Sequence, residues 1–314
     1  MKTIKIHFFS ILVLLCIHAS VFSQGCSDAG FCTADSFKPN TVIINNTDSV
    51  STNNSDVLKN IFKISLSTGT ADRNITIYGA NIEYSRILTE NLGLNIKLAS
   101  LSQSGKEHTT ASLSDIYING NYKFNNLINF SLGVKLPLNN ANEKKGTIPL
   151  PMDYQSSLGT VDAIAGLALV YNKLKIVVAA QQPVKQNNNS FLQTDHDSTS
   201  EFYSFQSTNK YIRKGDVLLR VAYMVPIGKK IIITPSVLPI YHLQNDEYTD
   251  RTGVKRTIDG SEGLTLNGNL VLEYHPNQKN GFEISFGTPF ITRKVRPDGL
   301  TRKYVLAIEY KYNF

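Results

Sequence analysis

The sequence predicts an all-β fold: an antiparallel transmembrane β-barrel of about twelve strands with an N-terminal plug-like segment. Three observations predict it. Segments of about ten residues alternate apolar and polar side chains along most of the chain, which is the period of a β-strand with two different faces. The connections between these segments alternate between short and long, and the chain begins with a stretch typical of exported proteins.

Residues 1–24 have the order of a secretory signal peptide. Lys2 and Lys5 precede an apolar stretch from Phe8 to Ile17, and small or polar residues follow it. We therefore expect cleavage near residue 24. Loss of the two lysines lowers the formal charge from +7 to +5. The other basic residues are scattered along the chain, so charge gives no indication of a nucleic-acid partner.

Residues 25–58 are polar and lie between the signal peptide and the expected barrel, which spans 59–314. This composition favours a loop or plug over a core element. Cys26 and Cys32 are predicted to form a disulfide, because an exported chain enters an oxidising compartment; lipidation of Cys26 is the alternative. The segment is expected to block the lumen as a plug or to form a periplasmic tail.

The expected strands alternate clearly in the sequence "LINFSLGVKL", where Ile128, Phe130 and Leu132 share one side. A change of phase at 78–79 suggests a bulge in the second strand. Strands near ten residues match a tilted crossing of a membrane, whereas the strands of a soluble β-sandwich, the rival fold, are usually shorter. The expected strands lie near 60–69, 74–86, 91–102, 112–124, 127–137, 157–171, 174–184, 214–226, 230–242, 262–275, 281–294 and 301–314.

The connections fall into two sets. Short turns are expected at 87–90, 125–126, 172–173, 227–229 and 276–280, and longer loops at 103–111, 138–156, 185–213 and 243–261. The first and last hairpins, near 71–73 and 295–300, are exceptions of modest length. Outer-membrane barrels place short turns at the periplasmic rim and longer loops outside. An even number of strands puts both ends of the barrel at the short-turn rim. We therefore expect the cell outer membrane as the location.

The last strand ends in "YVLAIEYKYNF", with apolar and aromatic residues on one side. This segment resembles the C-terminal signature of outer-membrane barrels, whose last strand alternates apolar residues and stops on Phe. The resemblance implies two partners, the lipid of the outer membrane and the barrel assembly machinery, which reads the C-terminal strand. Lipid contact explains why a chain would end on the aromatic ring of Phe314.

The opposite side of each strand is expected to face the lumen. Basic and acidic residues both occur there, so they are expected either to pair and stiffen the barrel or to form a constriction that selects solutes. No preference for anions or cations follows, because neither sign dominates. The lumen candidates are Lys97, Lys135, Arg220, Glu273, Glu283 and Glu309.

Three prolines fall within the expected strands, namely Pro235, Pro239 and Pro289. Proline lacks the N–H that a strand donates to its neighbour. Each is therefore expected at a bulge or a local break in the wall. Such a break is either a bulge tolerated near a rim or an opening through which a ligand leaves sideways into lipid.

The loop 138–156 contains the apolar stretch "TIPLPMDYQSS". A stretch this apolar is unfavourable in water. We expect Ile148, Leu150, Met152 and Tyr154 to fold over or into the barrel mouth, either as loop packing or as a constriction that touches the solute.

The sequence shows no nucleophile with a base and an orienting group beside it, so no catalytic residue, metal site or cofactor is predicted. The overall plan loosely resembles the fatty-acid and hydrocarbon transporter class of outer-membrane barrels, which have more strands. That resemblance implies transport of small apolar compounds. The prediction from the sequence is an outer-membrane channel or transporter for a small solute. The alternative is a non-conducting accessory barrel that binds protein partners through its loops or N-terminal segment.

Overall fold

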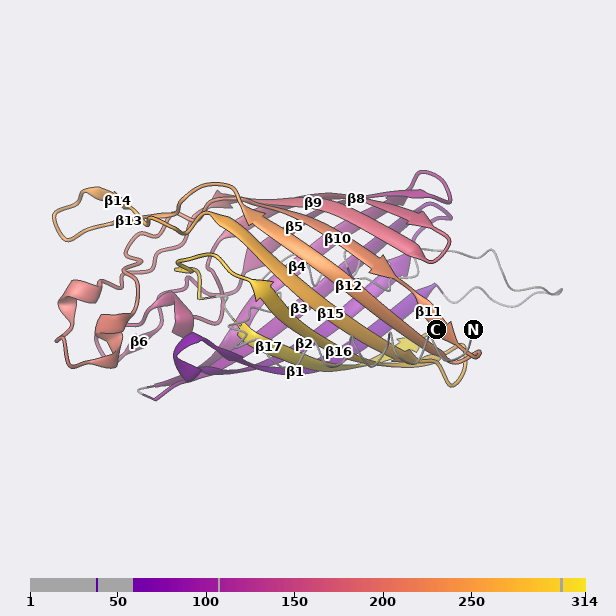
Figure 1. Ribbon diagram of the computed structural model, residues 1–314, viewed down its shortest axis with the longest axis horizontal. Helices are drawn as coiled ribbons and strands as arrows, with labels where there is room; N and C mark the ends of the chain where they lie inside the picture. The colour runs from indigo at the N-terminus through magenta and orange to yellow at the C-terminus, as the bar shows by residue number, and fades with distance from the viewer. Residues whose placement is uncertain (1–37, 39–58, 107, 300–301) are drawn as a thin grey trace, which may run out of the picture.

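The computed structural model describes residues 38, 59–106, 108–299 and 302–314. Its strands close into one antiparallel barrel of twelve spans, in which β10 and β11 are two parts of one span (Figure 1). The predicted barrel is confirmed, and every expected strand is present with its ends shifted by a few residues. The spans are β1 (Asn60–Ala71), β2 (Thr76–Ile87), β3 (Leu92–Ser104), β4 (Thr109–Lys123), β5 (Ile128–Pro137), β8 (Val161–Tyr171), β9 (Leu174–Lys185), β10 (Asp216–Tyr223) with β11 (Val225–Ile227), β12 (Ile231–His242), β15 (Gly263–Tyr274), β16 (Asn280–Ile291) and β17 (Arg302–Asn313).

The first and last strands close the barrel. β1 pairs with β17 from Ile61↔Asn313 to Ala71↔Arg302. At the rim, the Asn60 and Phe314 backbones exchange two hydrogen bonds of 2.9 Å each. The terminal residue therefore completes the ladder, which leaves no free sheet edge at this rim.

The outer surface of the barrel is apolar. Large side chains that would be buried in a soluble protein are exposed along the spans, including Leu132 at 71% and Ile308 at 53%. Near the short-turn rim the rings of the exposed Phe282 and the half-buried Tyr310 pack at 5.3 Å, and those of the exposed Tyr312 and Phe314 at 5.6 Å. An apolar band with aromatic residues at its border is the surface that a transmembrane barrel presents to lipid. Among the described residues, no helix is long and apolar enough to cross a membrane.

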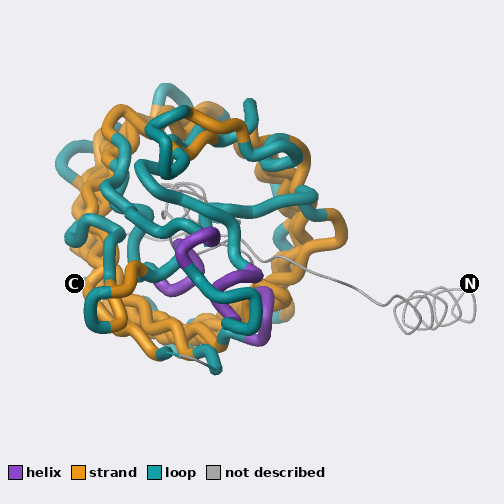
Figure 2. Tube along the Cα trace, turned by 90° about the vertical axis from the view of Figure 1, so that its left-hand side faces the viewer, coloured by secondary structure: helices purple, strands orange, loops and turns teal. Residues whose placement is uncertain are grey.

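The two rims differ. The short turns and the C-terminus lie at one end, and the long loops gather at the other (Figure 1). Viewed from the loop end, loops and short helical turns run across the inside of the ring of strands (Figure 2). The loop elements are η3 (Asp72–Asn74), β6 (Lys144–Lys145), β7 (Ile148–Pro149), η4 (Met152–Tyr154), η5 (Gln193–Asp195), η6 (Glu201–Ser204), β13 (Glu247–Thr249) and β14 (Lys255–Thr257).

The prediction of a bulge at 78–79 is wrong. β2 pairs with β1 and β3 in an unbroken register through Tyr78 and Gly79. The apolar pattern changes phase there because Ile77 faces inward and is fully buried in a cluster beneath the loops. An apolar residue that faces inward near the mouth gives the same change of phase in the sequence pattern as a bulge would.

Candidate functional site

A belt of charged side chains lines one half of the barrel. It follows the strand register across β8, β5, β4, β3, β2 and β1. Its charged members are Asp162, Lys135, Lys97, Glu83 and Lys63, and the Tyr117 ring lies between Lys135 and Lys97. Signs largely alternate along this charged belt, so neighbouring charges pair. Burial in a wall of low dielectric is tolerated only with such pairing.

Two ion pairs and one ring contact hold the charged belt together. Lys135 Nζ lies 2.8 Å from Asp162 Oδ2, and both side chains are fully buried. Lys63 Nζ donates to Glu83 Oε1 at 3.0 Å. The ammonium of Lys97 lies 5.7 Å from the centre of the Tyr117 ring, within the range of a cation–π contact.

An acidic row lies across β15, β16 and β17. Glu273 pairs in register with Glu283, and Glu283 with Glu309. All three side chains belong to the inward positions of their strands. His275 lies 3.5 Å from the carboxylate of Glu273. Carboxylates on three neighbouring strands repel one another unless a cation lies near them.

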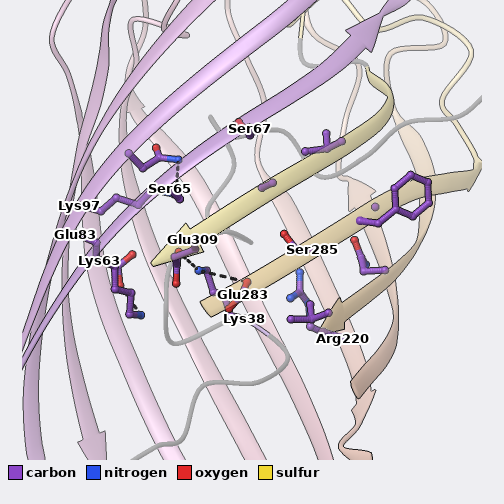
Figure 3. Close-up of a pocket in the computed structure, with 17 residues that line it drawn as sticks. Lys38, Lys63, Ser65, Ser67, Glu83, Lys97, Arg220, Glu283, Ser285 and Glu309 are labelled. Atoms are coloured by element: carbon purple, nitrogen blue, oxygen red, sulfur yellow. Dashed lines mark hydrogen bonds and ion pairs between the residues drawn. The ribbon is translucent and has the colours of Figure 1, made fainter. Parts of the chain in front are cut away.

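A cavity of about 120 Å³ lies inside the barrel between the charged belt and the acidic row (Figure 3). Four of the six predicted lumen residues line it, and Lys135 and Glu273 lie outside its lining. Small side chains of β1, β16 and β17 form the floor between the charges. The charged lining is Lys38, Lys63, Glu83, Lys97, Arg220, Glu283 and Glu309.

Lys38 is the described residue of the 25–58 segment, and it lies in this cavity. Its Nζ donates to Glu309 Oε2 at 2.7 Å and lies 3.9 Å from Glu283 Oε1. Its carbonyl accepts a hydrogen bond of 2.7 Å from Lys175 Nζ on β9. Residue 38 thus touches walls on well-separated sides of the barrel. The signal peptide, the disulfide expected between Cys26 and Cys32, and the rest of the expected plug lie outside the described residues.

The mouth of the barrel is packed with apolar side chains. Loop residues Leu150, Tyr154, Phe202 and Phe205 join Ile77 and other wall residues in one buried cluster. The Tyr154 and Phe202 rings meet edge to face at 6.1 Å. Packing of this kind is that of a soluble protein core, and in this structure it lies at the loop end of the barrel.

A second mouth cluster contains Met152 with Tyr211 and Ile258, so three long loops meet there. The backbone of Met152 passes so close to Gly299 that a Cβ on this glycine would lie 2.4 Å from the Met152 carbonyl oxygen. Of the four residues expected at the mouth, Leu150, Met152 and Tyr154 are buried. Ile148 departs from the expectation: β6 and β7 form a small hairpin that leaves it 44% exposed.

A buried polar network lies beneath these clusters, at the end of β12. His242 bonds Asp216 through Nδ1 at 2.7 Å and Asp246 through Nε2 at 2.8 Å. Asp246 also accepts from the Tyr211 hydroxyl at 2.7 Å and, through its backbone N–H, donates to Ser261. The network therefore joins the wall to the β9–β10 and β12–β15 loops.

Asp298 links the β16–β17 loop to the same network. Arg293 donates to it at 2.8 Å, and Arg213 lies 3.9 Å away and also pairs with Asp216. Burial opposes ionisation of Asp298, but Arg293 and Arg213 more than offset it and hold the pKa of the carboxyl below its usual value. The charges thus tie three loops together.

Asp153, in η4, has the opposite environment. Burial raises its pKa to about 6, although Arg73, 3.9 Å away, lowers it in part. A carboxyl with such a pKa changes charge near neutral pH. The mouth therefore contains one acid whose pKa is raised, Asp153, and one whose pKa is lowered, Asp298.

The predicted prolines lie at irregularities of the wall. β12 faces β10 and β11 in a single register, from Asp216↔His242 to Ile227↔Ile231. Within the described strands this ladder is interrupted twice, and by the same register Pro239 and Pro235 lie at the interruptions, opposite Leu219 and Tyr223. We name this join the β10–β12 seam. The missing proline N–H groups account for both gaps.

Pro289 lies elsewhere. It pairs with Asn267 of β15 beside a register shift between Leu266 and Asn267. That shift is a bulge, which accommodates a proline in a closed sheet. The three prolines therefore divide into two at the seam and one at a bulge.

Neither Lys38 nor the Asp216–His242–Asp246 network is predicted by the sequence pattern. Lys38 lies outside any periodic segment, so alternation gave no signal for it. His242 ends a strand and Asp246 lies four residues later in a loop. A charged residue at an inward position near the mouth, such as Asp216, was the available sign.

No family of known proteins and no curated protein matches the sequence. Among solved structures, the chain is similar to the KdgM porin at 11% identity and a TM-score of 0.42, over 80% of this chain and 99% of that one. The chain is similar to the NanC porin at 8% identity and a TM-score of 0.45, over 81% of this chain and 98% of that one. It is similar to a FadL homologue of Pseudomonas aeruginosa at 10% identity and a TM-score of 0.40, over 82% of this chain and 76% of that one. By its own strand pairing and apolar exterior, the chain is a closed twelve-stranded β-barrel of the outer-membrane type.

Proposed function

We propose that the protein is an outer-membrane channel for small polar solutes. The observation that carries the proposal is the cavity inside the barrel, which is lined by charged side chains of both signs. A charged, hollow lumen costs free energy that an apolar filling would avoid. A lining of this kind favours polar solutes over the apolar compounds that the resemblance to hydrocarbon transporters implies.

Passage requires the mouth to open. Tyr154 and Leu150 are fully buried among loop side chains at the end of the pathway. The loops connect to the wall through polar contacts such as His242–Asp246, and these contacts would have to rearrange. We therefore expect a low conductance at rest, with openings that depend on loop motion.

Planar-bilayer conductance and liposome swelling test the proposal. The mature chain and a variant lacking 25–58 would be compared, because the expected plug lies in that segment. Solute flux is expected in both, and it should be higher in the variant. Failure of both proteins to pass ions or sugars, with the barrel shown to be folded by its shifted mobility in unboiled gels, would refute a channel.

An accessory barrel that binds protein partners is the second candidate. The observation in its favour is the β13–β14 hairpin, which projects beyond the rim (Figure 1). Its tip is exposed, with the Arg251 side chain at 70% and Val254 at 48%. Absence of flux combined with stable co-purification of a partner, lost on removal of 250–254, would favour this function.

A further inference from the structure

A cation already lies between two of the three glutamates of the acidic row. The ammonium of Lys38 lies between Glu309 and Glu283, at 2.7 and 3.9 Å. Lys38 belongs to none of the wall strands, and 271 residues separate it from Glu309. The wall therefore holds a positively charged group that comes from outside it (Figure 3).

The site is built for this occupant. The Glu309 side chain is 10% exposed and that of Glu283 14%, so both carboxylates are largely removed from water. The register places them directly opposite each other on β16 and β17. Two ionised carboxylates so placed repel each other, and an ammonium between them removes this repulsion.

The backbone of residue 38 is held independently of its side chain. Lys175, which is 1% exposed on β9, donates to the Lys38 carbonyl at 2.7 Å. In the sheet order, β9 lies five strands from β17 by the shorter path through β10 and β12. The ammonium is thus presented to the acidic row across the lumen rather than along the wall.

An organic ammonium fits this geometry better than a metal ion. Among the described residues, no three His, Cys, Asp or Glu side chains are placed to hold a metal. Two carboxylates with a polar floor of Ser65 and Ser285 offer acceptors for the three N–H groups of an ammonium. Space beside the ammonium exists, because the cavity has about 120 Å³.

We propose that Glu283 and Glu309, with the cavity beside them, form a binding site for a small organic ammonium solute, and that the Lys38 side chain is its tethered competitor. The site would give the channel its solute class, so its physiological use rests on the proposed channel function. Binding itself is measurable without transport. A tethered ligand competes at an effective concentration in the mM range, so a free ammonium should bind weakly while Lys38 is present.

Isothermal titration of ethylammonium into the full mature chain in detergent micelles tests this proposal. Lys38→Gln should tighten ethylammonium binding at least about tenfold over the natural chain. Adding Glu283→Gln and Glu309→Gln to Lys38→Gln should abolish the binding. Lys279→Gln removes a lysine from a short turn and should bind as the natural chain does. Ethanol, which has the same carbon chain without the charge, should give no binding heat in any variant.

Two results would overturn the site. One is unchanged affinity in Lys38→Gln while the gel mobility of the unboiled protein shows a folded barrel. The other is an equal gain in Lys279→Gln, which would mean that only net charge matters. Conductance measurements distinguish failure of the ammonium site from failure of the proposed channel. Ethylammonium binding without conductance would refute the channel and leave the site. Conductance without ethylammonium binding would refute the site and leave the channel.

Discussion

The mouth of the barrel and the middle of its lumen are filled in different ways. At the mouth, Leu150, Tyr154 and Phe202 are buried in one apolar cluster, as in the core of a soluble protein. In the middle, charged side chains such as Lys63 and Glu309 surround a cavity. A packed core yields only when its loops move, whereas paired charges exchange partners with an entering solute. For the proposed channel we therefore expect the barrier to passage at the mouth and the selection of solutes in the middle.

The largest effect is expected from breaking the apolar packing at the mouth. Tyr154→Ala removes a fully buried ring that packs against Phe202 and Phe205. Loss of a buried aromatic side chain costs about 3–5 kcal/mol, here mostly from the loop packing. Single-channel conductance should rise, and the urea midpoint followed by circular dichroism should fall. Tyr203→Ala, in the β9–β10 loop beside Phe202 but 42% exposed, is the control and should change neither.

The polar network should give the next largest effect. Asp298→Asn leaves the buried Arg213 and Arg293 without their shared carboxylate, and breaking a buried pair costs about 3 kcal/mol or more. The control is Arg251→Gln, which removes an exposed pair with Asp195 and should cost below about 1 kcal/mol. Urea titrations of both variants measure the difference. Equal losses in the two would show that burial does not strengthen the mouth network.

The pH dependence of this network has a definite sign. The pKa of Asp298 is lowered in the folded protein, so its contribution is present above the pKa of an unfolded carboxyl, about 4. The contribution is lost as the pH falls through the lower folded value. Urea midpoints of the natural chain and Asp298→Asn should therefore converge at strongly acidic pH.

The contrast between the two regions also explains what the sequence could predict. Each strand could be located because its alternation is local. Contact with lipid alone explains why Ile128, Phe130 and Leu132 are apolar. The inward direction of Glu283 and Glu309 followed from the same parity. Their meeting with Lys38 did not, because a contact between residues 271 positions apart leaves no periodic trace.

Loops were harder to predict than strands for the same reason. The apolar stretch around Leu150 indicated burial, but its partner Phe202 lies in another loop and the pairing depends on tertiary structure. Ile148 is left 44% exposed by the β6–β7 hairpin, and this hairpin of two paired residues has no signal in the sequence pattern. Burial of a loop segment is thus predictable from composition, and the direction of each side chain is not.

A smaller effect at the mouth concerns Asp153. Its folded pKa of about 6 lies above that of a free carboxyl, so protonation stabilises the packed mouth, and stability should increase as the pH falls from about 7 towards 4. Asp153→Asn removes this dependence and should stabilise the protein at pH 7.5 by on the order of 2–3 kcal/mol. Urea midpoints at pH 7.5 and 4.5 check it. A pH dependence that survives in Asp153→Asn would assign it to another group.

The smallest effect is expected at the β10–β12 seam, which differs from both the mouth and the middle because its weakness lies in the wall. Replacing Pro235 and Pro239 by Val restores two N–H donors opposite β10, each worth about 1 kcal/mol. The greater freedom of the unfolded chain offsets part of that gain, so net stability should change by less than about 1 kcal/mol. Deuterium exchange of the peptide 216–223 should nevertheless slow, because the restored ladder protects its amides, while Pro289→Val should leave it unchanged.

If the seam also serves as a sideways exit, solute flux should fall in the double variant. Unchanged flux together with slower exchange would mean that the wall had been sealed and that solutes leave along the barrel axis.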